Sequence, residues 1–196
     1  MFVWRGNTLP LFNHPYKRTA ANERAVELSV VQAWTDPSVS DEYRLEVGNV
    51  LAHYPELSHA GMVVDRHEVN PGVTNVDVFD VGTEFCPCDL FDEIISISTL
   101  EHVRWDEVPR EAGGSVAAIH HLRTLLAPGG RMLVTIPTGW NQPLDEWLAA
   151  DRTGATQVQT MRRQGSGWVE VEGPLILPYA FSTQWAEAVW IGEFHG

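Results

Sequence analysis

The sequence predicts an α/β fold in which a doubly wound, mainly parallel sheet of seven strands carries helices on both faces. Short apolar segments alternate along the chain with amphipathic ones, which is typical of strand–helix–strand units. The segment Phe91–Ile97 is almost wholly apolar and rich in isoleucine, as expected of a strand that is covered on both faces. At 196 residues the chain is long enough for one hydrophobic core, so we expect a single domain.

Composition excludes several classes of partner. The formal net charge is −13, from 26 acidic and 13 basic residues, which argues against binding to nucleic acid or to anionic membranes. Cys86 and Cys88 are too close in sequence to indicate a disulfide framework, and a zinc site would need further ligands at suitable spacing, so we expect no metal. No apolar run approaches the ~20 residues that span a bilayer. We expect a soluble, cytoplasmic protein.

The amino-terminal part divides into an arm and a helix. Residues 1–20 show aromatic and proline residues without periodicity, so we expect an irregular arm that precedes a domain of residues 21–196. From Ala21 to Trp34 the apolar positions fall largely on one face, which indicates a helix, and Asp36 and Pro37 end it.

The next segment is a strand, a turn and the start of a helix. Arg44–Val47 is expected to form a short buried strand, and Gly48 permits a sharp turn. Asn49 is expected to cap a helix that runs through Tyr54. Such a junction directs unpaired backbone N–H groups at the carboxyl edge of the sheet, where open α/β sheets bind ligands.

The remaining elements continue the alternation of strands and helices. Two segments that end in an acid, Gly61–Asp65 and Val76–Asp80, are expected to be the next strands. The elements expected after them are a central strand at Phe91–Ile97, a helix at Gly114–Leu126, a strand at Arg131–Ile136 after a Pro-Gly-Gly break, a short helix at Pro143–Ala150, and closing strands at Thr156–Arg163 and Ala188–Phe194, with Trp168–Glu172 extending a hairpin.

Five sequence blocks carry a resemblance to a known family. They are Leu45–Gly48, Val63–Asp65, Val78–Asp80, Ser96–Val103 and Leu126–Val134. In this order and spacing they resemble a class I S-adenosylmethionine-dependent methyltransferase, over about residues 21–137. The resemblance implies a Rossmann-like fold, S-adenosylmethionine as cofactor, and methyl transfer to a hydroxyl or amine of a small polar molecule or a glycan.

The resemblance also implies which residues contact the cofactor. It places Glu46, Gly48 and Asn49 beside the methionine part, Asp65 on the ribose hydroxyls and Asp80 on the adenine amino group. A carboxylate can accept two hydrogen bonds from a diol, and a glycine lets the backbone approach a ligand closely. The segment that contains Ser98, Leu100 and His102 would form the floor between cofactor and acceptor.

The residues expected to contact the methyl acceptor lie in segments without a clear periodicity. If the arm folds over the sheet edge, four residues would border the acceptor pocket: His14, Tyr16, Trp140 and Asn141. A hydroxyl acceptor needs a group that takes its proton, and His102 is the residue that we expect to act as the general base.

One departure from the family pattern leaves an alternative open. Val50 and Ala52 stand where the family usually has glycines. The alternative to an enzyme is therefore a non-catalytic relic of the fold that binds a cofactor or a partner. The same lack of glycines, together with the Pro-Gly-Gly block, disfavours a nicotinamide-dependent oxidoreductase.

Overall fold

A computed structural model describes residues 1–57, 60–86, 88–180 and 185–196. Its main sheet has eight strands, one more than expected. They are β3 (Arg44–Val47), β4 (Met62–Val64), β5 (Val73–Thr74), β6 (Phe91–Ile97), β7 (Leu126–Pro137), β8 (Gln157–Gln164), β9 (Gly167–Glu172) and β10 (Ala188–His195). The α-helices are α1 (Arg24–Trp34), α2 (Gly114–Arg123) and α3 (Gln142–Ala149).

The strand order places a topological switch point in the middle of the sheet. The order is β5-β4-β3-β6-β7-β10-β8-β9. The chain moves outward from β3 to β5 and then returns to β6, which pairs with β3 on its other side. The five strands from β5 to β7 are parallel, whereas β10 is antiparallel to β7 and β8. Open sheets of this kind bind ligands at the carboxyl ends of the strands, at such a reversal.

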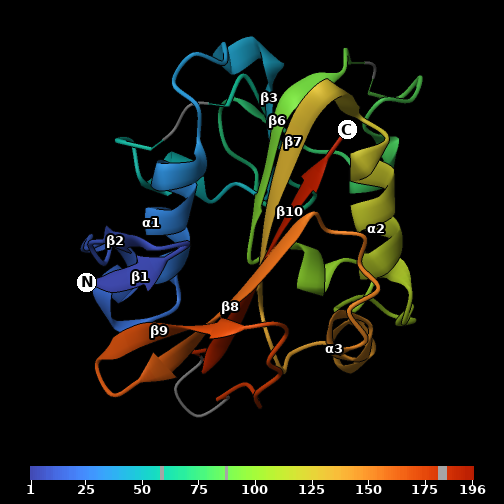
Figure 1. Cartoon of the computed structure of the whole chain (residues 1–196). Coiled ribbons are helices and arrows are strands. Elements are labelled where there is room, and N and C mark those ends of the chain that lie inside the picture. The colour runs from blue at the N-terminus through green and yellow to red at the C-terminus, as the bar shows by residue number, and fades with distance from the viewer. Residues whose placement is uncertain (58–59, 87, 181–184) are drawn as a thin grey trace.

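Helices cover both faces of the sheet, as the sequence predicts (Figure 1). Helix α1 packs on one face through a cluster that includes Val30 and Ile95. Helices α2 and α3 pack on the other face through a cluster that includes Ile119 and Ile94. Because successive side chains of a strand point to opposite faces, the adjacent residues Ile94 and Ile95 serve the two different clusters.

The expectation of an irregular arm is wrong for residues 2–9. They form a hairpin of β1 (Phe2–Trp4) and β2 (Asn7–Leu9), and the side chains of Phe2 and Trp4 are buried in the same cluster as α1. The Arg5 guanidinium pairs with Glu193 on β10, with Nη1 2.6 Å from Oε2. The hairpin is therefore part of the packed domain.

Two further elements differ from the sequence predictions. The strand expected at Val76–Asp80 is absent, since β5 lies earlier and residues Val78–Asp80 form one 3₁₀ turn that the Asp77 carboxylate caps by accepting from the Phe79 N–H. The helix expected after Gly48 is a single 3₁₀ turn at Leu51–His53. Both changes shorten the elements around the carboxyl edge of the sheet and leave room there.

Candidate functional site

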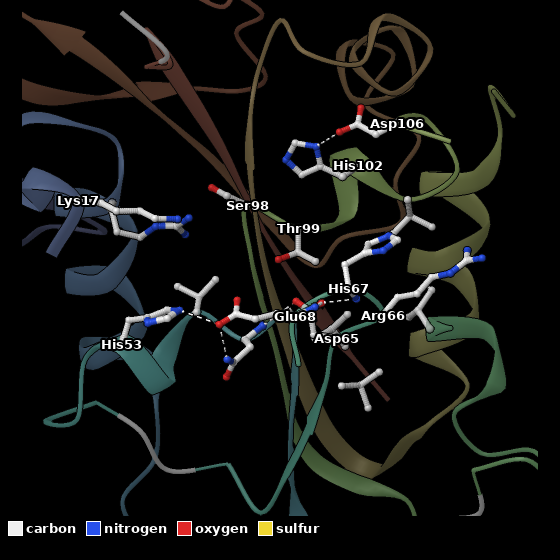
Figure 2. Close-up of a pocket in the computed structure, with 18 of the residues that line it drawn as sticks. Lys17, His53, Asp65, Arg66, His67, Glu68, Ser98, Thr99, His102 and Asp106 are labelled. Carbon is white, nitrogen blue, oxygen red and sulfur yellow. Dashed lines mark hydrogen bonds and ion pairs between the residues drawn. The ribbon is translucent and has the colours of Figure 1, made fainter. Parts of the chain in front are cut away.

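A cavity of about 910 Å³ opens above the carboxyl ends of β3, β4 and β6, beside the switch point (Figure 2). Its walls come from the turn after β3, the loop after β4, the loop after β6, and a 3₁₀ segment at Tyr16–Ala21 together with the start of α1. This volume is in the range of small-molecule sites. Six valines give the cavity an apolar part: Val47, Val50, Val64, Val76, Val78 and Val103.

The turn at Gly48 requires glycine for two reasons. The residue has φ of +89°, a conformation that residues with a side chain rarely adopt. A Cβ on Gly48 would also collide with the side chain of Thr99, which lies in the loop after β6. Close packing between these two loops therefore places both Gly48 and Thr99 on the floor of the cavity.

The backbone N–H groups of this turn are all used within the protein. Gly48 donates to the Val64 carbonyl, and Asn49 donates to Asp65 Oδ2 at 3.2 Å. Val50 and Leu51 both donate to Glu46 Oε1, each at 2.7 Å. The expectation of unpaired N–H groups at a helix start is wrong, because the Glu46 carboxylate caps a short 3₁₀ turn in place of Asn49. The turn offers no cradle for a phosphate.

The buried Glu46 carboxylate stabilises the turn after β3. Its side chain does not line the cavity, and the residue is only 1% exposed. Burial raises the pKa of the Glu46 carboxyl to about 7, although the hydrogen bonds from Leu51 and Val50 oppose this rise. Its Oε2 atom is buried and has no hydrogen-bond partner among the residues that the structure describes.

Asp65 and Glu68 form the acidic wall of the cavity, next to Asn49 and His53 (Figure 2). Asp65 directly follows β4, at the position that the sequence predicts. The Glu68 carboxylate accepts a hydrogen bond from Asn49 Nδ2 at 2.9 Å and lies 3.1 Å from His53 Nε2. The His53 ring stacks on Tyr16, with centroids 4.3 Å apart, so the 3₁₀ segment and the acidic wall are in contact.

Arg24 lies among buried carboxylates at the other side of the cavity. Its Nη1 is 3.1 Å from Glu27 Oε2, and Glu27 Oε1 accepts the hydroxyl of Ser98 at 2.6 Å. Burial raises the pKa of the Glu23 carboxyl, and the neighbouring Glu27 raises it further. Burial also holds the pKa of the Glu101 carboxyl well above its usual range. Arg24, Glu23 and Ser98 line the cavity.

His102 lines the cavity and is held by a carboxylate on each side. Its Nδ1 is 2.6 Å from Asp106 Oδ2, and its Nε2 is 3.5 Å from Glu101 Oε1. Asp106 Oδ1 accepts the indole N–H of Trp140 at 3.1 Å, and the Trp140 ring packs edge-on against His102. The arrangement orients the imidazole and leaves Nε2 as the nitrogen with the more distant partner.

The structure brings only some of the predicted residues into the cavity. Those that line it are Tyr16, Gly48, Asn49, Asp65, Ser98 and His102. Trp140 does not line the cavity but contacts His102 and Asp106, and Leu100 is buried in the core. Asp80 lies in a smaller cavity beside Phe85 and Arg104, because the strand expected before it does not form.

The other two predicted acceptor residues have structural contacts. Asn141 is buried: it accepts the Leu144 N–H at the start of α3 and donates to the Glu101 carbonyl. His14 accepts the Tyr16 N–H through Nδ1 and packs edge-on against Tyr54. Neither residue is among those that line the cavity.

Sequence reasoning missed Arg24 and Glu68, which both line the cavity. A second acid three residues after Asp65 was a usable signal for Glu68. Arg24 had no comparable signal, because an arginine near the start of an amphipathic helix is ordinarily exposed to solvent.

The described part of the chain holds neither a metal-ligating cluster nor a helix that could span a membrane. Within residues 1–57, 60–86, 88–180 and 185–196, no group of three or more histidine, cysteine or carboxylate residues is placed to hold a metal ion. In the same part of the chain, no helix is long and apolar enough to cross a membrane.

Comparisons with known proteins find similarity in structure only. No protein-family profile and no curated protein matches the chain. Similar solved structures include the N-methyltransferase NodS from Bradyrhizobium japonicum WM9 in complex with S-adenosyl-L-homocysteine, which is 16% identical over 78% of this chain and 76% of that chain with a TM-score of 0.48. A methyltransferase from Thermotoga maritima, described as a possible histamine N-methyltransferase, is 15% identical over 85% of this chain and 86% of that chain with a TM-score of 0.49.

The [4+2]-cyclase SpnF is similar to the same degree, with 16% identity over 78% of this chain and 65% of that chain and a TM-score of 0.47. At these identities and TM-scores, the likeness assigns no activity to this chain. NodS and the Thermotoga maritima protein are named as methyltransferases, and SpnF is named as a cyclase.

Proposed function

We propose that the protein binds S-adenosylmethionine in the cavity and transfers its methyl group to a hydroxyl or amine of a small polar molecule or a glycan. The observation that carries this proposal is the character of the cavity at the switch point. It offers carboxylates and an apolar wall, and the turn beside it has no free N–H group for a phosphate. Dinucleotide cofactors need such a phosphate site, whereas S-adenosylmethionine carries no phosphate.

The residues that line the cavity fit the parts of this cofactor. The valine wall suits an adenine ring, and the acidic loop after β4 suits the ribose hydroxyls. Arg24 is a cation beside Glu23, so this pair suits the carboxylate and the ammonium of an amino-acid end. Gly48 lines the same cavity and adds no side chain to it.

The chemistry at the acceptor side follows from His102. When bound, the cofactor supplies a methyl group on a positively charged sulfur. In this role His102 Nε2 would take the proton of the acceptor hydroxyl, while Asp106 keeps Nδ1 protonated and the ring in place. The bond between sulfur and the methyl carbon would be the one that breaks, so the cofactor would leave as a neutral thioether. Positioning supplies most of the acceleration in such a displacement, and a general base contributes about 10²- to 10⁴-fold.

Thermal unfolding with added ligands tests the proposal. A ligand at about 100 times its Kd stabilises the native state by about 2.7 kcal/mol, which is about 5–10 °C for a domain of this size. We expect S-adenosylhomocysteine to raise the melting temperature in this way and NAD to leave it unchanged.

Two outcomes would count against the enzyme. No shift with millimolar S-adenosylhomocysteine would exclude cofactor binding and favour a relic of the fold that binds a partner. A shift without methyl transfer from radiolabelled S-adenosylmethionine to any of a panel of hydroxyl and amine acceptors would favour a cofactor-binding relic.

A further inference from the structure

We propose that Glu68, and not Asp65, is the residue that binds the vicinal hydroxyls of a ribose in this cavity. This inference rests on the proposed function to the extent that the ligand is a nucleoside. It assigns different tasks to the two acids of the loop after β4: Asp65 holds the loop in shape, and Glu68 faces the ligand.

Most of the hydrogen-bonding capacity of Asp65 is used by the backbone. Its Oδ1 accepts the N–H groups of His67 and Glu68, both at 2.8 Å. Its Oδ2 accepts the N–H of Asn49 at 3.2 Å, across the cavity floor. A carboxylate offers about four lone-pair sites, so three of the sites of Asp65 are taken. Asp65 therefore joins its own loop to the turn at Gly48.

Glu68 has one oxygen fixed and the other available. Its Oε1 accepts from Asn49 Nδ2 and Asn70 Nδ2, and His53 Nε2 lies 3.1 Å from the same atom. Within the described part of the chain, every polar contact of this carboxylate is made by Oε1. The side chain is 36% exposed, and Figure 2 shows it reaching into the cavity.

The contacts at Oε1 give Oε2 a defined position before any ligand arrives. Three side chains hold the carboxylate, and His53 is itself held by its stack on Tyr16. Oε2 can therefore accept hydrogen bonds from a ribose without ordering a mobile side chain first, which is the requirement for a preorganised site. A diol, with two neighbouring donors, is the part of a nucleoside that matches such an acceptor.

The test compares two nucleosides on isosteric variants. Isothermal titration calorimetry would measure the affinity of adenosine and of 2′,3′-dideoxyadenosine for the wild-type protein, Glu68→Gln and Asp65→Asn. Because a hydrogen bond to a charged group is at stake, we expect the wild type to prefer adenosine by roughly tenfold to a hundredfold. Glu68→Gln should lose most of this preference, whereas Asp65→Asn should keep it and unfold at a lower temperature.

Controls keep the two assignments apart. Glu56→Gln removes the same charge from an exposed residue that does not line the cavity, and it should leave the preference unchanged. Glu68→Asp is a second variant at the proposed residue: it keeps the charge but shortens the side chain, and it should also lose the preference.

The outcomes distinguish this inference from the proposed function. A preference that survives in both Glu68→Gln and Glu68→Asp, while S-adenosylhomocysteine still binds, overturns the role of Glu68 alone. If neither adenosine nor S-adenosylhomocysteine binds the wild-type protein, the nucleoside site and the proposed function are both overturned.

Discussion

At the scale of single residues, a neighbouring carboxylate defines the orientation of His102 in the cavity. Asp106 Oδ2 lies 2.6 Å from Nδ1, and the Trp140 indole donates to the other oxygen of the same carboxylate. The hydrogen bond that one ring nitrogen makes decides which nitrogen carries the proton in a neutral imidazole. The structure therefore predicts a ring with the proton on Nδ1 and a lone pair on Nε2.

This tautomer can be measured without knowing the acceptor. Long-range ¹H–¹⁵N correlation spectra at alkaline pH should show the Nδ1–H form of His102 in the wild-type protein. Asp106→Ala should shift the ring toward the Nε2–H form, since the acceptor at Nδ1 is lost. Trp140→Phe is the control, because it removes only the indole donor and should keep the wild-type tautomer. An unchanged tautomer in Asp106→Ala would show that Asp106 does not orient the ring.

Three of the predicted site residues that line the cavity are tied to a strand end. Gly48, Asp65 and Ser98 each directly follow a strand, so the position of the strand determines where they lie. Asn141 and Leu100 are buried and do not line the cavity, and the sequence does not show whether a loop side chain points into a cavity or into the core. The sequence therefore predicts which residues lie at a strand end better than it predicts which way a loop side chain points.

At the scale of elements, the turn after β3 depends on contact with the loop after β6. The two loops meet where Gly48 faces the Thr99 side chain. The turn thus combines an unusual φ with a close interloop contact, and the two effects can be separated by comparison with another glycine. Gly72 has a similar φ, +85°, and no atom within 4 Å of the place where its Cβ would lie.

Alanine substitutions at the two glycines should therefore lower the free energy of unfolding by different amounts. Gly72→Ala brings only backbone strain and should lower the free energy of unfolding by about 1–2 kcal/mol. Gly48→Ala adds a steric clash and should cost about 1–3 kcal/mol more. Urea unfolding at equilibrium measures both. Equal losses would show that the Thr99 contact relaxes without cost.

The predictions of elements succeeded for long apolar runs and failed for short segments. Phe91–Ile97 forms β6 with the predicted bounds, since seven residues with one exposed side chain among them have a clear pattern. Strand β5 has only two residues, and its pairing with β4 is what forms it, so no local pattern marks it. The hairpin of β1 and β2 was missed for a similar reason, because β9 and the core give it its partners.

At the scale of the whole molecule, buried carboxyl groups make stability depend on pH. Burial raises the pKa of four carboxyl groups: Glu23, Glu46, Glu101 and Asp145. The native state then holds protons that the unfolded chain releases above its ordinary values of 3.8 and 4.5. Their contribution to stability is present at low pH and is lost as pH rises through the native values.

We therefore expect the free energy of unfolding to fall between about pH 4.5 and pH 7. The rise of the Glu46 pKa from 4.5 to about 7 alone corresponds to about 3 kcal/mol. Glu46→Gln keeps an oxygen that can accept from Val50 and Leu51 but does not titrate, so its stability should change less over this range. Urea unfolding at several pH values measures the slope. A slope in Glu46→Gln as steep as in the wild type would show that Glu46 is not the source.

The hairpin of β1 and β2 also constrains the order in which parts of the protein can fold during synthesis. The Arg5 guanidinium contacts Gln159 and Glu193, and its backbone N–H faces the Glu170 carboxylate, so Arg5 joins the hairpin to three strands near the other end of the chain. During synthesis the amino-terminal segment emerges first, and loop closure over such a separation is slow. The contacts of Arg5 consequently form only after β8 to β10 have been translated, whereas α1, which shares a cluster with Phe2 and Trp4, is translated much earlier. The hairpin is thus joined to β8, β9 and β10 only late in synthesis.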